Sequence, residues 1–322
     1  MKPVFALDLG STKVACLAAE ADDNGGLRVL GAASVPCQAM RRGILSDAED
    51  LGRAISDAVR QAEEASNTRA EELVVGLSGV NVEGTSAQGF VPIYPRSRPI
   101  TREDVLQVIN HSRQIVLPPD RELIMSMPRE FRVDGQRGIA KPIGMVGSKL
   151  EVVTFIVNAT TAYIESIEKV IHRTGKEVSE MVFQPLAAGM GVLRPQDMEL
   201  GCVVADIGGG MTNVAVFSNG SLAYGASVPV GSWHITSDIS KLLKTSIEEA
   251  ERLKVESGGA TSRIAKDDES VQVCNSGRRI SAPCSAKCFA RSWRAASRRS
   301  RASFASRSSA VAFRACCLAA WC

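Results

Sequence analysis

The sequence has 322 residues, more than one hydrophobic core needs, so we expect two or more domains. No apolar run approaches the roughly 18 residues of a membrane helix, and Asp8 interrupts the first apolar stretch, which argues against a signal peptide. The net charge of +3 divides into +10 over residues 270–322, where no Asp or Glu occurs, and −7 over residues 1–269. We therefore expect a cytosolic protein with an acidic body and a basic tail.

The N-terminal region predicts a small sheet covered by a helix. An apolar strand over residues 4–9 contains Asp8, turns on Gly10-Ser11-Thr12-Lys13 and resumes as a second strand. A third strand is expected over 27–35. Ser46 and Glu49 match a capping box, and apolar residues at helical spacing follow it, so a helix should begin there. A buried strand over 73–77 completes the order β-β-β-α-β.

From about residue 82 the pattern predicts a separate α+β segment. Prolines punctuate a loop between residues 92 and 99, and Thr101 with Asp104 predicts a capped helix. Strands are expected over 122–128 and 150–157. We interpret residues 82–159 as a compact insertion. The competing interpretation, an elaborated loop of the first domain, accounts less well for a capped helix and strands.

The chain then returns to alternating helices and strands. A helix over 160–174 should end at Gly175, and a strand over 178–183 leads into Gln184-Pro185, where proline favours the first turn of a helix. The small residues of 187–191 should let this helix approach a neighbour closely.

A second hairpin then repeats the pattern of the first. The apolar run over 203–205 ends at Asp206, and Gly208-Gly209-Gly210 follows; the two Asp residues lie 198 positions apart. This spacing suits one copy in each domain of a duplicated fold. Adjacent glycines present backbone N–H groups to an anion, and an Asp at a strand end can hold a cation. The pair predicts a site for a metal-bound phosphate, although either turn alone is also compatible with a ligand-free hairpin.

Beyond the second hairpin we expect a strand over 222–228, a turn ending at Gly231 and two helices up to about residue 257. From residue 270, Ser, Arg, Ala and Cys supply 38 of the last 53 residues, without sustained periodicity. Cys284 and Cys288 lack the additional ligands that a zinc site needs. We predict that residues 270–322 form a disordered, basic, low-complexity tail and that the protein has no nucleic-acid partner.

The two hairpins resemble the paired phosphate motifs of the actin, Hsp70 and sugar-kinase ATPase superfamily. Gln184-Pro185-Leu186 resembles the start of its domain-connecting helix. Within that superfamily the sequence is most similar, from residue 3 to about 257, to the FtsA family of bacterial cell-division proteins. The motifs that carry this likeness are Leu117–Glu122, Asp134–Ile139, Lys141–Met145, His234–Ile239 and Glu249–Lys254.

The resemblance implies an α/β fold: an actin-like (ribonuclease-H-like) two-domain ATPase core with an inserted α+β subdomain. Residues 1–81 and 160–200 would form the first domain, residues 82–159 the FtsA-specific subdomain, and residues 201–269 an incomplete second domain.

The resemblance also implies a site for ATP and Mg²⁺. Asp8 and Asp206 would hold Mg²⁺ through water, because magnesium keeps much of its hydration shell. Glu251 and Lys254 share a helix face and would contact the ribose and adenine, with a solvated salt bridge as the competing interpretation. The implied nucleotide-binding residues are Gly10, Ser11, Thr12, Lys13, Gly208, Gly209, Gly210, Thr212, Gly231, Glu251 and Lys254.

Three departures from the family pattern predict binding with slow or negligible hydrolysis. Gln184, the candidate catalytic residue, stands where Glu is usual, and an amide orients water but is a very poor base. Met211-Thr212-Asn213 replaces Thr-Thr-Asp, and Gly231-Ser232-Trp233-His234 replaces Gly-Gly-Asp-His. We expect at most a weak ATPase.

The family role implied is an ATP-binding scaffold that helps assemble the Z ring and links FtsZ to the cytoplasmic membrane. Implied partners are FtsZ, further copies of the chain, other division proteins through residues 82–159, and the membrane surface at the division site. The family's membrane-tethering helix is not found after residue 270, and we interpret this tail as an out-of-frame reading. The alternatives are a sugar or acid kinase, for which no catalytic Asp is evident, and a pilus-assembly adaptor of actin-like fold.

Overall fold

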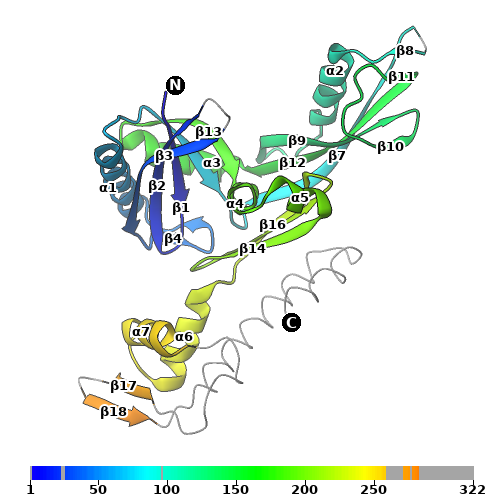
Figure 1. The fold of residues 1–322 in the computed structure, drawn as a ribbon. Coiled ribbons are helices and arrows are strands. Elements are labelled where there is room, and N and C mark those ends of the chain that lie inside the picture. Colours follow the sequence, from blue (N-terminus) through cyan, green and yellow to red (C-terminus); the bar gives the residue numbers. More distant parts are fainter. Residues whose placement is uncertain (1, 23–25, 96, 259–270, 276–277, 283–322) are drawn as a thin grey trace. The chain divides into compact units, whose positions relative to one another are not determined.

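The computed structural model describes the chain except for residues 1, 23–25, 96, 259–270, 276–277 and 283–322 (Figure 1). The chain forms two compact units. The first contains Met1–Asp206 and Asn213–Ser227, and the second contains Ile207–Thr212 and the described residues from Val228 onward. Among the described helices, none has the length and apolar character needed to span a membrane.

The first unit begins with a five-stranded mixed sheet in the order β13-β6-β1-β2-β3. β1 and β2 form the first hairpin and β3 extends it antiparallel, while β6 and β13 run parallel to β1 on its other side. The three strands, helix and strand that the sequence predicted are all present, and a short hairpin, β4–β5, that was not predicted lies before the helix. The elements are β1 Val4–Leu9, β2 Lys13–Ala21, β3 Leu27–Pro36, β4 Met40–Arg41, β5 Ile44–Leu45, α1 Ala48–Ser66, β6 Glu72–Leu77, α3 Thr161–Arg173 and β13 Glu177–Phe183.

Helix α1 begins one residue later than its sequence pattern predicted. Asp47 is the N-cap, and its carboxylate accepts hydrogen bonds from the N–H groups of Glu49 and Asp50. The predicted cap, Ser46, instead donates its hydroxyl to the carbonyl of Ala39 at 2.7 Å. Ser46 was the wrong choice because two adjacent residues can both cap a helix, and the backbone just before β4 binds the first of them.

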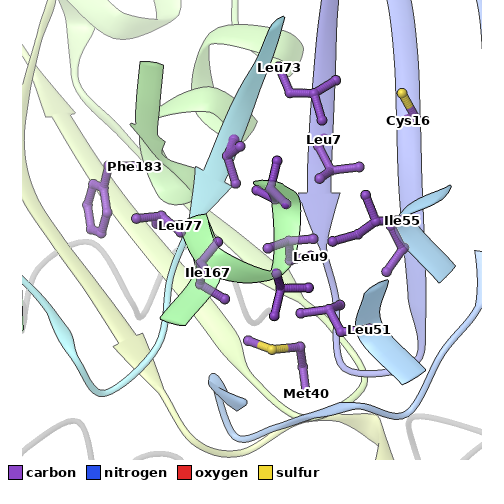
Figure 2. Packing of buried hydrophobic residues seen from close by; sticks show 14 of the residues in the cluster. Leu7, Leu9, Cys16, Met40, Leu51, Ile55, Leu73, Leu77, Ile167 and Phe183 are labelled. Atoms are coloured by element: carbon purple, nitrogen blue, oxygen red, sulfur yellow. The ribbon is translucent and has the colours of Figure 1, made fainter. Parts of the chain in front are cut away.

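The core of this region lies between the sheet and its helices. Leu7 and Leu9 of β1, Leu73 and Leu77 of β6, and Leu51 and Ile55 of α1 converge with Ile167 of α3 (Figure 2). Burying each such side chain stabilises the fold by about 1.5–3 kcal/mol. The strand that carries Asp8 is therefore anchored on both sides of that residue by buried leucines.

Residues 82–160 form a four-stranded antiparallel sheet in the order β10-β9-β12-β7, with α2 packed against it. The predicted capping box is present: Thr101 and Asp104 bond each other's backbone N–H, and Arg98 binds the Asp104 carboxylate with two 2.7 Å hydrogen bonds. The elements are β7 Val82–Pro92, β8 Arg98–Pro99, α2 Arg102–Arg113, β9 Arg121–Val133, β10 Gln136–Ile139, β11 Val146–Gly147 and β12 Lys149–Thr160.

This segment has a core of its own and also shares the core of the first sheet. Leu150 and Val152 of β12 belong to a separate cluster with Val108 of α2. Further along the same strand, Phe155 and Val157 belong to the cluster that contains β1 and α1. The long strands thus run continuously from one hydrophobic core into the other.

The first unit closes with two short helices and most of a three-stranded sheet in the order β14-β15-β16. Gln184-Pro185 begins a helix as predicted. Close packing of this helix is found at Gly189, where an added Cβ would lie 2.4 Å from the ring of Phe217, but not at Gly191, where it would have no heavy atom within 4 Å. The elements are α4 Gln184–Val192, α5 Pro195–Leu200, β14 Cys202–Ile207, β15 Thr212–Ser218 and β16 Ser221–Val228.

The second unit contains α6 (Ser232–Leu243) and α7 (Ile247–Ser257), which contact each other. Ser246 caps α7 by accepting the N–H of Glu249 at 3.2 Å. Two strands follow, β17 (Val271–Asn275) and β18 (Arg278–Ala282), and they pair antiparallel.

This hairpin corrects the prediction that residues from 270 onward are disordered throughout. Val271 and Val273 alternate with polar residues, and only two residues separate the strands, which is a hairpin pattern. The arginine-rich composition of the whole tail concealed these short strands. The remaining predictions for the tail, including those on Cys284 and Cys288, lie outside the described residues.

Candidate functional site

The two glycine turns that the sequence predicted as a repeat have the same backbone hydrogen bond. In the β1–β2 turn the N–H of Gly10 donates to the carbonyl of Lys13 at 3.0 Å. In the β14–β15 turn the N–H of Gly208 donates to the carbonyl of Met211 at 2.9 Å. A Cβ on Gly10 would lie 2.7 Å from the Lys13 oxygen, so the first turn requires glycine there. The sequence repeat is therefore also a structural repeat.

Each turn leaves two backbone donors beyond its closing bond. The N–H groups of Ser11 and Thr12, and those of Gly209 and Gly210, have no hydrogen-bond acceptor within the described part of the chain. Consecutive N–H groups in a tight turn form a concave site that suits an anion. The turns have the donors that the predicted phosphate contacts need.

Asp8 carries an unfavourable negative charge next to the first turn. Asp8 is exposed to solvent, but the surrounding protein displaces part of its hydration, and this desolvation raises its pKa. The charge of Asp206 raises that pKa further, while Lys13 and a hydrogen bond from Gln184 lower it. The two predicted metal-binding carboxylates therefore repel each other in the absence of a cation.

Gln184 is held between Asp8 and a serine that the sequence analysis did not single out. Its Nε2 donates to Oδ1 of Asp8, and its Oε1 accepts a hydrogen bond from the hydroxyl of Ser78. Gly76 makes room for this side chain, since a Cβ there would lie 2.9 Å from Cγ of Gln184. β1, β6 and β13 run parallel, so Asp8, Ser78 and Gln184 meet at the same edge of the sheet.

In the second unit, helix α6 holds the glycine turn by backbone hydrogen bonds. The N–H groups of Ser232 and Trp233 donate to the carbonyls of Gly208 and Gly209, at 3.0 and 2.8 Å. A Cβ on Gly231 would lie 2.4 Å from the Gly209 oxygen, which explains the glycine before this helix. The hydroxyl of Thr212, at the start of β15, donates to the carbonyl of Val230 at 2.7 Å and so joins β15 to the segment that leads into α6.

Glu251 and Lys254 share one face of α7 and form an ion pair at 2.6 Å. The buried hydroxyl of Thr236 on α6 donates to Glu251 at 2.5 Å and accepts from Lys254 at 3.0 Å. Desolvation opposes the charge of Glu251, but the hydrogen bonds from Lys254 and Thr236 outweigh it and lower its pKa. The pair is thus a fixed, partly buried cluster and not a fully solvated salt bridge.

Comparison with known proteins identifies the family. A model described as the SHS2 domain inserted in FtsA matches residues 79–158, and a model described as cell division protein FtsA matches residues 203–306. The cell division protein FtsA of Neisseria meningitidis is 31% identical over 287 residues, covering 89% of this chain and 69% of the relative. The chain belongs to the FtsA family of cell-division proteins. FtsA of Borreliella burgdorferi is 32% identical, covering 86% of this chain and 67% of the relative.

Solved structures of other families share the actin-like fold at low sequence identity. The PilM–PilN type IV pilus biogenesis complex matches with a TM-score of 0.57 and 16% identity, covering 79% of this chain and 69% of that chain. MreB5 of Spiroplasma citri bound to ADP matches with a TM-score of 0.53 and 14% identity, covering 95% of this chain and 78% of that chain. The predicted fold, an actin-like core with an inserted subdomain, is confirmed.

The FtsA family model extends the likeness further along the chain than the sequence motifs did. The motifs end near residue 257, whereas the FtsA family model matches to residue 306. The family likeness therefore extends into the segment that we had separated as a tail. The chain spans about two thirds of the length of these FtsA relatives.

The structure shows the surroundings of two residues that depart from the expected FtsA pattern, Asn213 and Trp233. Asn213 is buried; its Oδ1 accepts the hydroxyl of Ser227 at 2.8 Å, and its Nδ2 donates to Asp206 at 3.4 Å. An amide at this position contacts Asp206 without adding a third negative charge. The side chain of Trp233 is 49% exposed, so the indole is accommodated largely at the surface.

The structure divides the predicted FtsA site residues between the two units. Asp8, Lys13, Gln184 and Asp206 interact within the first unit. The second unit holds Gly208, Gly209, Gly210, Thr212, Gly231, Glu251 and Lys254. Sequence reasoning missed Ser78 and Thr236, whose roles depend on strand pairing and helix packing.

Proposed function

We propose that this FtsA-family chain binds ATP with Mg²⁺ and acts as an actin-like scaffold linking FtsZ to the cytoplasmic face of the membrane during division. The repeated turn carries the proposal. Asp8 and Asp206 each stand two residues before the first glycine of such a turn, and both turns share one backbone hydrogen bond. The ADP-bound MreB5, which shares the fold, supports a nucleotide as the ligand.

The residues present fit a magnesium ion. The mutual repulsion that raises the pKa of Asp8 would be relieved by a divalent cation near both carboxylates. Among the described residues no group of three or more His, Cys, Asp or Glu side chains could surround a metal. Two carboxylates, with water and phosphate oxygens completing the shell, suit Mg²⁺ because it retains several waters.

Each group in the proposed site would have a distinct task in holding the nucleotide. The N–H groups of Ser11, Thr12, Gly209 and Gly210 would donate to phosphate oxygens, and Lys13 would offset their charge. The fixed cluster of Glu251 and Lys254 would contact the ribose and adenine. Bound Mg²⁺ would neutralise phosphate charge. These assignments follow the FtsA resemblance and the available donors.

We infer that hydrolysis is slow or negligible. Gln184 carries no basic atom that could remove a proton from water, and its amide already bonds both Ser78 and Asp8. Its place at the edge of the sheet suits holding Asp8 more than activating water. A turnover near the 1–1,000 per second of ordinary enzymes would contradict this inference.

The proposed partners follow from membership of the FtsA family. They are FtsZ, other copies of the chain, division proteins that contact residues 82–159, and the membrane surface. We propose no nucleic-acid partner. Localisation would be cytoplasmic, peripheral to the membrane at the division site.

Nucleotide binding is tested by titrating the full-length chain with a fluorescent ATP analogue, with Mg²⁺ or with EDTA. We expect binding that strengthens with Mg²⁺, and a loss of that strengthening in the Asp8→Asn and Asp206→Asn variants. The matched control is Asp57→Asn, which removes an exposed carboxylate from α1. A wild-type chain that binds no ATP in either condition would overturn the nucleotide assignment.

The scaffold role is tested by co-sedimentation of the full-length chain with FtsZ polymers, with vesicles containing anionic lipid, and with both together. We expect the chain to pellet with FtsZ polymers and to bring FtsZ down with vesicles. If it pellets with neither component at concentrations where an intact FtsA relative does, the linking role is wrong for this chain.

A further inference from the structure

Ser78 occupies a position from which it controls the direction of the Gln184 amide. An ionised carboxylate only accepts hydrogen bonds, so the amide nitrogen of Gln184 must face Asp8. The amide oxygen then faces the other way, where the hydroxyl of Ser78 donates to it. The three side chains form one directed series of donors that ends on the Asp8 carboxylate.

The backbone around Ser78 is held in place independently of Gln184. The hydroxyl of Tyr163 on α3 donates to the carbonyl of Ser78 at 3.3 Å, and burial raises the pKa of Tyr163 to about 12, which keeps this donor protonated. Gly79 follows with a φ of +120°, a conformation that glycine adopts without strain. A Cβ on Gly43 would lie 2.5 Å from Cα of Gly79, so the β4–β5 turn packs directly on this backbone.

We propose that Ser78 is a positioning residue for the metal–nucleotide site, acting through Gln184 to fix the Asp8 carboxylate that Mg²⁺ would use. The proposal rests on the proposed ATP function and deepens it. Asp8 experiences repulsion from Asp206, so without a fixed donor its carboxylate would turn away from that charge. The amide of Gln184 opposes this movement, and the hydroxyl of Ser78 stops the amide from turning with it.

If Ser78 is a positioning residue, removing its hydroxyl should weaken only the part of ATP binding that Mg²⁺ contributes. Hydrogen bonds to charged groups are strong, and a site loses affinity when its ligands are no longer held in place. Removing the Ser78 hydroxyl should therefore reduce by about tenfold the factor by which Mg²⁺ strengthens ATP binding. Binding of ATP in EDTA depends on the N–H groups of the turns and on Lys13, so it should not change.

The experiment measures the dissociation constant of a fluorescent ATP analogue in EDTA and in Mg²⁺ for each full-length variant. The ratio is the dissociation constant in EDTA divided by that in Mg²⁺, so a larger ratio means a larger contribution from the metal. Ser78→Ala should lower the ratio about tenfold, and Ser78→Thr, which keeps the hydroxyl, should restore it. Gln184→Ala should lower the ratio as far. The double variant should fall no further than Gln184→Ala alone, because Ser78 acts only through Gln184.

The outcomes separate this proposal from the function on which it rests. An unchanged ratio in Ser78→Ala overturns the positioning role while the ATP site stands, and so does an equal loss in Mg²⁺ and EDTA. A wild-type chain that binds no ATP overturns both. If Ser78→Ala melts below the assay temperature, Ser78→Cys, with a similar volume and a weak donor, replaces it and should show the same loss.

Discussion

The two glycine turns have the same backbone bond but opposite means of support. The first follows β1, where Leu7 and Leu9 are buried on either side of Asp8, and the side chain of Gln184, itself bonded by Ser78, holds that carboxylate. The second follows β14, where Ala205, Asp206 and Ile207 are all exposed, and backbone N–H groups of α6 hold the turn. One turn depends on hydrophobic burial and side-chain contacts, and the other depends on close backbone packing. The same local sequence can therefore be stabilised in two ways.

The largest expected difference in the free energy of unfolding is between alanine variants of Leu9 and Ile207, which directly follow Asp8 and Asp206. Leu9 is 7% exposed and Ile207 is 51% exposed. Leu9→Ala should lower the free energy of unfolding by about 2–5 kcal/mol, because it leaves a cavity in the core. Ile207→Ala should change it by no more than about 0.5 kcal/mol. Urea denaturation of both variants checks this, and equal losses would show that the two turns are supported alike.

The backbone support of the second turn is tested at Gly231. A Cβ there would meet the Gly209 carbonyl at 2.4 Å, so Gly231→Ala should cost about 1–3 kcal/mol and weaken ATP binding. Gly191 of α4 is the matched control, because a Cβ there has no heavy atom within 4 Å. Gly191→Ala should stabilise the fold by up to about 1 kcal/mol. Thermal melts and ATP titrations that show no difference between the two variants would refute the close packing.

The charge on the first turn gives a pH-dependent prediction. Desolvation and Asp206 raise the pKa of Asp8 above its ordinary value of 3.8, so the folded chain binds this proton more tightly than the unfolded chain does. The stability contributed by Asp8 is full below pH 3.8 and is lost as the pH rises through the raised value. Without Mg²⁺, Asp8→Asn should therefore melt at a higher temperature than the wild type near neutral pH and lose this advantage in acid.

Asp206→Asn provides the comparison for that measurement. It removes one of the charges that raise the pKa of Asp8 but leaves the desolvation, which is the larger cause. Its gain in melting temperature near neutral pH should have the same sign and be smaller. Melting curves across pH in EDTA decide this, and a lower melting temperature for Asp8→Asn at neutral pH would contradict the assigned repulsion.

The smallest stability effect is expected at the ion pair of α7. Lys254→Met should lower the free energy of unfolding by no more than about 1 kcal/mol. Lys169→Met, the control, breaks a more exposed pair with Glu165 on α3. Only Lys254→Met should also weaken ATP binding. If Lys254→Met binds ATP as the wild type does, the assignment of this pair to the nucleotide is wrong.

The sequence pattern was sufficient wherever a local rule determined the structure. Alternating apolar residues and glycines located both turns, and the spacing of Thr101 and Asp104 identified a cap that the structure contains. Ser46 failed as a cap because Asp47, its neighbour, satisfies the same rule. The β17–β18 hairpin was missed because the composition of a long segment outweighed a short alternating pattern.

The candidate site was predictable only in part, for a physical reason. Asp8 and Gln184 follow from motifs, but Ser78 joins them because β6 lies between β1 and β13 in the sheet. Strand order is a long-range property, and neither hydrophobic periodicity nor spacing along the chain reveals it. Thr236 was missed similarly, since its contact with Glu251 requires α6 to pack on α7.

The strands shared by the two hydrophobic cores give the inserted subdomain a mechanical property. β12 pairs with β7 in an unbroken register from Lys149 to Ala159, so a regular ladder joins the two cores. Its pairing with β9 covers nearly the same length, with register shifts between Val153 and Thr154 and between Val157 and Asn158. At its base, Arg121 binds the carbonyls of Asn81 and Asn158, where the chain enters and leaves the subdomain. The subdomain thus resembles a beam fixed at one end: a load applied near α2 would bend the ladder or pull on its base, and could not simply swing the subdomain on a hinge.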